Sequence, residues 1–337
     1  MPQKKKIMLT GGAGYIGAHT AVELINQGFE PLLIDNFSKS DRTLLKGVET
    51  IVNRKIVFLE GDCRDAVFLN TLFSKNKFDS VIHFAAYKSV KESVIHPMKY
   101  YDNNLGSMIT LLQAMQQHNI NEFIFSSSCT VYGQPDHIPV DEQAPFKRAE
   151  SPYGATKQMC ERILEDAVAA NQNLKAISLR YFNPVGAHPS ALIGEMPTDV
   201  PDNLVPYVTQ TAAGLRPKLT VFGSDYSTPD GSCLRDFIHV VDLAQAHVKA
   251  LEKINGMPTR MEAFNLGTGE GVSVLQLVKK FIEVTGVKLN YEVGSRRPGD
   301  VEKTYANADK ANNLLGWKTK LSLEDALTDA WRWQKTL

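Results

Sequence analysis

Tyr153 and Lys157 lie four residues apart in a segment with helical spacing, so a phenol and an ammonium share one helix face. Ser128 ends a run of three serines after an expected strand, and its hydroxyl can hydrogen-bond the oxygen of an alcohol. These groups suit the removal of a hydroxyl proton while hydride leaves the carbon that bears it. The same spacing also arises by chance, with the tyrosine in a core and the lysine in solvent, so its context decides.

Tyr153 can act as the base only if its pKa falls from about 10 towards neutrality, which requires about 4 kcal/mol. One positive charge at about 4 Å, under an effective dielectric of about 20, supplies a similar amount. We therefore expect Lys157, together with the positive charge of the group that accepts the hydride, to lower the pKa of this phenol.

A glycine-rich loop follows the first expected strand and precedes a helix. Gly12, Gly14 and Gly17 satisfy G-x-G-x-x-G, and Gly11, Gly14 and Gly17 satisfy the G-x-x-G-x-x-G variant. The first glycines permit a tight turn whose backbone N–H groups approach a pyrophosphate, and the last lets the helix pack closely on the strand. In this context the loop predicts dinucleotide binding rather than a turn without a ligand.

Two acidic residues are placed to select the dinucleotide. Asp35 closes the second expected strand 21 residues after Gly14, where it can accept hydrogen bonds from an adenosine ribose. A carboxylate there repels a 2′-phosphate, and Asn36 follows with no adjacent arginine, so NAD is favoured over NADP. Asp62 follows the third expected strand and either contacts the adenine amino group or caps a helix over 66–73.

The elements that position these residues alternate between short apolar runs and longer helical stretches, as in a parallel sheet with crossover helices. Continuous apolar runs are typical of strands covered on both faces. Six strands are expected, near Ile7–Thr10, Pro31–Ile34, Ile56–Leu59, Ser80–His83, Glu122–Ser126 and Ala176–Leu179. The expected fold class is α/β, a Rossmann-type doubly wound parallel sheet with a smaller C-terminal substrate-binding lobe.

The domain boundary is expected where the texture of the sequence changes. Frequent prolines interrupt every pattern between residues 183 and 217, which indicates a loop-rich lobe. We therefore expect an NAD-binding domain over 1–182 and a substrate-binding lobe over 183–337, some segments of which return to the first domain.

Composition excludes several function classes. The 337 residues carry 37 Lys+Arg and 37 Asp+Glu, so no basic surface for nucleic acid or an anionic membrane is expected. The basic start precedes too short an apolar run for a signal segment, and no run approaches the roughly 18 apolar residues of a membrane span. Four scattered cysteines and eight histidines without an H-x-x-x-H pair favour a reducing cytoplasm and no metal centre.

Four longer segments are specific to one family. They are YYDNN over 100–104, SCTVYG over 128–133, LRYFNPVGAHP over 179–189 and DGSCLRDFIHV over 230–240. With the glycine loop and the Tyr153/Lys157 pair, the chain resembles the extended short-chain dehydrogenase/reductases and, within them, the UDP-glucose (UDP-galactose) 4-epimerases over nearly its full length. The resemblance implies reversible epimerisation at carbon 4 of UDP-hexoses, by transient hydride transfer to tightly bound NAD through a 4-keto intermediate.

The resemblance also implies a set of site residues. The catalytic residues are Tyr153, Lys157 and Ser128. The NAD contacts are Gly11, Gly14, Tyr15, Ile16, Gly17, Asp35, Asn36, Asp62, Cys63, Phe84, Ala85, Lys88, Asn103, Tyr153, Lys157 and Tyr181. The UDP-sugar contacts are Ser128, Tyr153, Asn183, Asn203, Leu204, Leu219, Phe222, Arg235, Arg297, Asp300 and Thr304. The two arginines suit the phosphates of UDP, or each pairs a local acid such as Asp236 or Asp300.

Three positions bear on the sugar and uridine contacts. Phe237 and Asp202 stand where the family commonly has tyrosine and asparagine. Thr304 is small where relatives confined to glucose and galactose carry a bulky gate, so N-acetylated UDP-sugars are expected as substrates too. Tyr305 is adjacent, and a shift of one residue would restore a bulky gate.

The sequence also bears on two rival functions, a 4,6-dehydratase and a non-catalytic nucleotide sensor, and on a two-fold dimer. A 4,6-dehydratase of this fold needs an Asp-Glu pair directly after the serine of the fifth strand, where this chain has Cys129 and Thr130. A non-catalytic nucleotide sensor has no need of the three catalytic groups together. The helices expected over 97–117 and 153–170 are apolar on more than one face, which fits a thick core or the two-fold dimer that the resemblance implies.

Overall fold

A computed structural model describes residues 4–297 and 300–337 of the chain. Within these residues the first part contains β1 (Lys6–Thr10), α1 (Tyr15–Asn26), β2 (Glu30–Asp35), α2 (Thr43–Val52), β3 (Val57–Glu60), α3 (Ala66–Lys75), β4 (Ser80–His83), α4 (Val90–Ile95), α5 (Pro97–Gln117), β5 (Glu122–Ser128), η1 (Cys129–Tyr132), α6 (Pro152–Ala170) and β6 (Lys175–Tyr181). The second part contains β7 (Asn183–Val185), α7 (Leu204–Ala212), β8 (Leu219–Phe222), β9 (Leu234–Arg235), β10 (Phe237–His239), α8 (Val240–Lys253), η2 (Ile254–Gly256), β11 (Met261–Leu266), β12 (Val272–Ser273), α9 (Val274–Thr285), β13 (Tyr291–Gly294), β14 (Lys303–Thr304), η3 (Ala311–Leu315) and α10 (Leu323–Gln334).

The central sheet is parallel and has seven strands in the order β11-β6-β5-β4-β1-β2-β3. The six expected strands are all present, but the expected number is wrong because β11 pairs with β6 from the other part of the sequence. β3 also differs from the expected strand covered on both faces. As an edge strand it leaves Val57 56% and Leu59 38% exposed.

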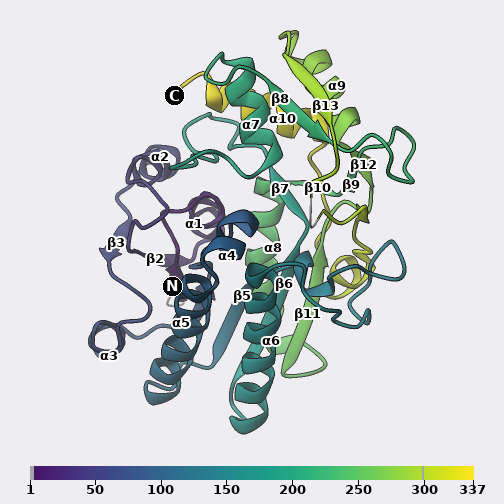
Figure 1. Cartoon of the computed structure of the whole chain (residues 1–337). Helices are drawn as coiled ribbons and strands as arrows, with labels where there is room; N and C mark the ends of the chain where they lie inside the picture. Colours follow the sequence, from purple (N-terminus) through teal and green to yellow (C-terminus); the bar gives the residue numbers. More distant parts are fainter. Residues whose placement is uncertain (1–3, 298–299) are drawn as a thin grey trace.

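Two apolar cores cover the two faces of this sheet. Successive strand residues point to opposite faces, so Leu9 packs with α1, α2 and α8, whereas Met8 packs with α3, α5 and α6. Figure 1 shows α5 and α6 side by side on one face. The α/β doubly wound fold is therefore confirmed, and the continuous apolar runs of the central strands follow from burial on both sides.

A smaller lobe lies beyond the carboxyl edge of the sheet, at the top of Figure 1. Its own core joins α7, α9, α10 and β8 through buried residues such as Val208, Leu277 and Leu327. Small sheets of order β10-β7, β12-β9-β14 and β13-β8 complete it. The chain crosses between the lobe and the sheet more than once, because β10 leads directly into α8 and β11 returns to the sheet.

No helix among the described residues is both long enough and apolar enough to span a membrane.

Candidate active site

The glycine loop connects β1 to α1 at the carboxyl edge of the sheet. Gly11 has φ 68°, and a Cβ there would lie 2.8 Å from the Ala85 backbone nitrogen. A Cβ at Gly17 would lie 2.3 Å from the Gly11 carbonyl oxygen, so the close packing of helix and loop requires glycine. Gly14 caps α1 without a side-chain hydrogen bond. The amides of the first helical turn, starting at Tyr15, thus form a cradle that fits a pyrophosphate.

Asp35 ties this loop to the end of β2. Its Oδ2 accepts a hydrogen bond from the Ala13 amide (3.1 Å), and its Oδ1 accepts from the Phe37 amide (3.0 Å) and the Ser40 hydroxyl (2.7 Å). A carboxylate has about four acceptor positions, so capacity for a ribose hydroxyl remains. The sequence did not predict this second role, in which Asp35 shapes the glycine loop.

Asp62 and its neighbours lie beside Asp35 across the ends of β2 and β3. The Asn36 amide donates to Asp62 (3.0 Å), and the Arg64 guanidinium binds the same carboxylate (2.8 Å) and lowers its pKa to about 2. The alternative role of Asp62 as a helix cap is wrong, because Asp65 caps α3. Burial raises the pKa of the Cys63 thiol to about 12, so it is a neutral group at this edge.

The loop after β4 connects the cofactor side to the smaller lobe. Lys88 donates to Oε1 of Glu195 (2.8 Å), and the Asn203 amide donates to the same oxygen (2.6 Å). Lys88, an expected NAD contact, and Asn203, an expected sugar contact, are thus joined by the carboxylate of Glu195. Sequence reasoning missed Glu195. No motif surrounds Glu195, and it lies 107 residues from Lys88.

Three further expected NAD contacts have partners within the chain. The Phe84 ring lies 4.7 Å, centroid to centroid, from that of His247. The Tyr181 hydroxyl lies 2.5 Å from Nε2 of His247, inside the core beside α1 and α8. The Asn103 amide donates to Asn104 (3.0 Å) and is 9% exposed. Their contacts with NAD remain predictions.

Helix α6 brings the reactive groups to the end of β5. Ser151 caps the helix by accepting from the Gly154 amide, and proline is its first residue. Tyr153 is the second residue of the helix and is half-buried. One turn further, Lys157 is 4% exposed and donates to the Ser126 carbonyl oxygen (2.5 Å). Ser128 is 9% exposed. The structure thus places the three expected catalytic residues on two adjoining elements.

Burial dominates the electrostatics of this site in the chain alone. It raises the pKa of Tyr153 to about 12, and the neighbouring Ser128 hydroxyl acts in the opposite direction. Burial lowers the pKa of Lys157 to about 8, and its ammonium is directed at Ser126. That Lys157 and a nicotinamide cation together lower the pKa of the phenol stays a prediction.

Two arginines of the smaller lobe, Arg235 and Arg297, lie at the carboxylate of Asp300. Arg297 donates to Oδ1 of Asp300 (2.6 Å), and Arg235 lies 3.7 Å from the same oxygen. Pairing with Asp236 is wrong, because that buried carboxylate accepts from the backbone amides of residues 268, 269 and 306. The intervening Pro298 and Gly299 lie outside the described residues. Oδ1 of Asn183 is buried and has no partner within the described chain, which fits a ligand donor at this point.

Strand pairing decides which way Thr304 faces. In β14 it lies beside Arg235 of β9, and paired residues of parallel strands share one face of a sheet. The adjacent Tyr305 ring packs at Gly271, where an added Cβ would lie 2.8 Å from the ring. Thr304 therefore shares the face of Arg235, and Tyr305 does not.

The remaining expected sugar and uridine contacts lie at the start of α7 and at the two ends of β8. Asn203 caps α7 and Leu204 begins it, whereas Leu219 and Phe222 are the ends of β8. Leu219 is 3% exposed, so any contact with a ligand uses its backbone, and the 41% exposed Phe222 ring lies 5.7 Å from the Arg297 guanidinium.

Comparison with known proteins gives full-length matches. The profile described as "NAD dependent epimerase/dehydratase family" matches residues 7–267. UDP-glucose 4-epimerase of Dictyostelium discoideum is 48% identical over 333 residues, covering 99% of this chain and 96% of that protein. UDP-glucose 4-epimerase of Bacillus subtilis (strain 168) is 48% identical over 330 residues, covering 98% and 97%.

Solved structures agree with these relatives. UDP-glucose 4-epimerase from Bifidobacterium longum in complex with NAD+ and UDP superposes with a TM-score of 0.94 at 43% identity, covering 98% of each chain. The Stenotrophomonas maltophila protein, UDP-glucose-4-epimerase with bound NAD and formylated UDP-arabinopyranose, superposes with a TM-score of 0.95 at 45% identity, again covering 98% of each chain.

Lys157→Met should stabilise the protein freed of nucleotide by about 1–2 kcal/mol at pH 7, because burial of the ammonium costs free energy that the apolar side chain avoids. A lysine with a folded pKa of about 8 binds fewer protons than its unfolded form between pH 8 and its ordinary value. The penalty is therefore complete below pH 8, and the advantage of the variant should shrink as pH rises further. Urea unfolding at pH 7 and pH 10 measures this, with the exposed Lys77→Met as control. A destabilised variant at pH 7 would contradict the prediction.

Proposed function

This chain belongs to the NAD dependent epimerase/dehydratase family, and we propose that it is an NAD-dependent isomerase that interconverts UDP-glucose and UDP-galactose. The observation that carries the proposal is the convergence of Ser128, Tyr153 and Lys157 at the carboxyl edge beside the glycine loop. Phosphates of a UDP-sugar would meet Arg235 and Arg297, and the sugar would reach the phenol. The relative solved in complex with NAD+ and UDP supports binding of these two groups.

The proposed chemistry uses each of these side chains once in each direction. Tyr153 removes the proton from the 4-hydroxyl, and NAD held at the glycine loop would supply the hydride acceptor for carbon 4. Ser128 holds the same oxygen in line, and Lys157 supplies positive charge near the phenol. Once the 4-keto sugar presents its other face, Tyr153 gives the proton back to the oxygen as carbon 4 regains its hydrogen. The cofactor would therefore be unchanged after a full cycle.

The residues that follow Ser128 disfavour dehydration. Elimination across carbons 5 and 6 needs an additional acid and base. Burial raises the pKa of the Cys129 thiol to about 12, so it stays protonated at pH 7. Thr130 offers a buried hydroxyl without an ionisable proton in this range. A non-catalytic sensor would not require the buried ammonium of Lys157, which costs stability.

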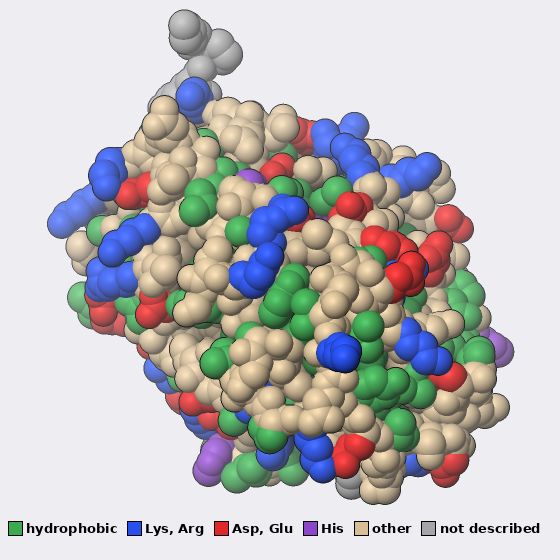
Figure 2. Space-filling view, turned by 90° about the horizontal axis from the view of Figure 1, so that it is seen from above, with side chains coloured by type: hydrophobic (Ala, Val, Ile, Leu, Met, Phe, Trp, Pro, Cys, Tyr) green, Lys and Arg blue, Asp and Glu red, His purple; other side chains and the backbone are tan. Residues whose placement is uncertain are grey.

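Several coarser features accompany this proposal. We propose that residues 1–182 bind NAD and that 183–337 bind the UDP-sugar, with α8 and β11 contributing to the first unit. The four cysteines are all free, which supports a reducing cytoplasm as its location. On the face shown in Figure 2, basic and acidic side chains are interspersed rather than gathered into one basic patch, which supports a small-molecule substrate.

Tyr153→Phe should lower kcat about 10²–10⁴-fold with UDP-galactose, because the phenol is the proposed proton carrier. UDP affinity should stay within about threefold, since the ring remains. Turnover is followed by formation of UDP-glucose, and UDP binding by calorimetry. Near-normal turnover would refute the assigned role, and a dehydrated ketosugar from the wild type would establish the rival reaction.

The purified protein should retain stoichiometric NAD(H), because loss of the reduced cofactor would strand the 4-keto sugar. The bridge from Lys88 through Glu195 to Asn203 spans the two parts of the site and supports this retention. Glu195→Gln should release NAD(H) faster during gel filtration than wild type or the exposed control Glu252→Gln. Catalysis that depends wholly on added NAD⁺ at every protein concentration would favour a freely exchanging dehydrogenase.

A homodimer is proposed through α5 and α6, which pack side by side on one face of the sheet. Their outer surface leaves Ile109 42% and Met159 44% exposed and contains a groove of about 200 Å³ bordered by Leu112 and Ile163. Light scattering at micromolar concentration should give twice the 37.4 kDa chain mass, and the Ile109→Glu variant should give the monomer. A monomeric wild type counts against this interface.

UDP-N-acetylglucosamine and UDP-N-acetylgalactosamine should also be interconverted, because Thr304 leaves space on the face shared with Arg235. The acetamido group adds three heavy atoms to the hydroxyl that it replaces, and forcing them against a packed ring costs about 1–3 kcal/mol. Thr304→Tyr should therefore lower kcat/KM for the N-acetylated pair about 10–200-fold relative to the plain pair. Absence of N-acetyl activity in the wild type, or no loss in the variant, would overturn this specificity.

A further inference from the structure

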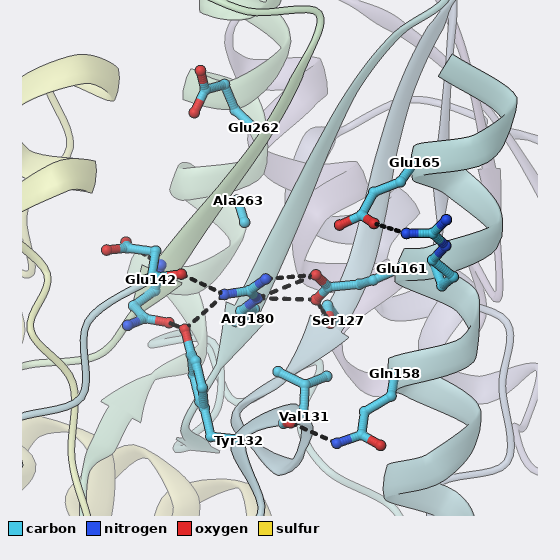
Figure 3. A network of polar contacts seen from close by, with 12 residues as sticks. Ser127, Val131, Tyr132, Glu142, Gln158, Glu161, Glu165, Arg180, Glu262 and Ala263 are labelled. Carbon is cyan, nitrogen blue, oxygen red and sulfur yellow. Dashed lines mark hydrogen bonds and ion pairs between the residues drawn. The ribbon is translucent and has the colours of Figure 1, made fainter. Parts of the chain in front are cut away.

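A buried ion pair lies directly behind the reactive groups. The side chains of Glu161 on α6 and Arg180 on β6 are 1% and 6% exposed. Two parallel contacts join them, from Nη2 to Oε2 (2.7 Å) and from Nε to Oε1 (3.0 Å). Figure 3 shows the guanidinium between this carboxylate and Tyr132, whose hydroxyl accepts from Nη1 (2.9 Å). The reaction proposed above uses neither charge.

The pair belongs to a continuous register between α6 and β5. Tyr153, Lys157 and Glu161 follow one another at intervals of four along one helix face. Two successive residues of the serine run bond two successive residues of this helix face. The carbonyl of Ser126 accepts from Lys157, and the Ser127 hydroxyl donates to Glu161 (2.5 Å). Ser127 directly precedes Ser128, which is proposed above to hold the oxygen of the substrate.

Strand β6 secures this register from the other side. Arg180 pairs with Ser127 across β5 and β6, so the guanidinium and the serine reach the same carboxylate from neighbouring strands. Tyr132 passes the contact on to Asn265 on β11 (2.6 Å). The carboxylate of Glu161 therefore joins the catalytic helix to β5 and β6 directly, and to β11 through Arg180 and Tyr132.

Stability alone does not account for an ion pair at this position. The desolvation of two charges largely offsets their attraction, and well-packed apolar residues of similar volume often stabilise as well or better. The pair instead adds orientation. The bidentate contact of the Arg180 guanidinium restricts the position of the Glu161 carboxylate, and hence the axial position of α6.

We propose that Glu161 and Arg180 are positioning residues for the isomerase reaction, which fix α6 on the sheet so that Lys157 and the serine run keep their places relative to the phenol of Tyr153. This inference rests on the proposed function. It assigns to the pair a share of turnover that acts through geometry and charge, separate from its effect on folding.

The charge of Glu161 also bears on Lys157. The groups that face this ammonium are Cys160 and Glu161 from α6, His83 from β4, and the Phe125 ring and Ser126 carbonyl from β5. The carboxylate favours the ammonium, whose pKa burial has lowered to about 8. Removal of the carboxylate charge should lower that pKa further, so the alkaline decline of kcat should move to lower pH.

The central test is the double variant Glu161→Gln/Arg180→Met, which removes both charges and leaves neither one unpaired. It should unfold cooperatively and bind UDP as the wild type does. Its kcat should fall about 10–100-fold with KM within about threefold, because displaced groups affect the transition state most. The alkaline limb of its kcat profile should shift to lower pH, because the charge of the pair that acts on the Lys157 ammonium is that of Glu161. Asp166→Asn, on the solvent side of α6, is the control that should change neither quantity.

Ser127→Ala removes a single hydrogen bond from the same carboxylate and keeps the ion pair, so it decides the matter if the double variant fails to fold. Its kcat should fall by about 3–10-fold with KM within about threefold, and its pH profile should keep its place because the carboxylate charge remains. Unchanged kcat and an unchanged profile in the folded double variant, or otherwise unchanged kcat in Ser127→Ala, would overturn the proposal even if the melting temperature falls. An inactive wild type would instead overturn the proposed function.

Discussion

The burial of the Lys157 ammonium against the end of β5 is the constraint on which the site depends. A lysine at 4% exposure is stable only if its donors are used, and the Ser126 carbonyl accepts one of them at 2.5 Å. This contact holds α6 close to the sheet. The phenol one turn before the lysine and the serine two residues after the carbonyl therefore meet at one edge.

The glycine loop lies at the same edge of the sheet, and residues of β4 and of the loop after it contact both the glycine loop and Lys157. The backbone at Ala85 packs so closely on Gly11 that no Cβ fits there, and His83 of β4 faces both Thr10 and Lys157. Burial and the adjacent ammonium lower the pKa of that histidine to about 3. It is neutral at physiological pH, so the lysine is the charged one of these two groups.

Local sequence predicted the elements that are defined by local physics. The glycine loop, the α5 bounds and the place of Tyr153 and Lys157 on one helix face follow from turn geometry and helical spacing. Contacts between distant segments were not predictable in this way. The pairing of β11 with β6, the bridge at Glu195 and the pair of Glu161 with Arg180 depend on tertiary packing, which leaves no short-range signal. Local sequence also does not predict how far burial raises the pKa of Tyr153 in the chain alone, because desolvation depends on the whole surroundings of the ring.

Two cationic groups of the smaller lobe are ordered by one acid. Arg235 and Arg297 both face Asp300, which limits their repulsion and orders two long side chains at one point. A diphosphate offers more acceptor oxygens and more negative charge than one carboxylate, so under the proposed function it would replace this shared partner without first organising the guanidinium groups. Pairing with a local acid is therefore compatible with the proposed binding of phosphate by the same two arginines. The backbone contacts of Asp236, directly after Arg235, hold the chain at this position.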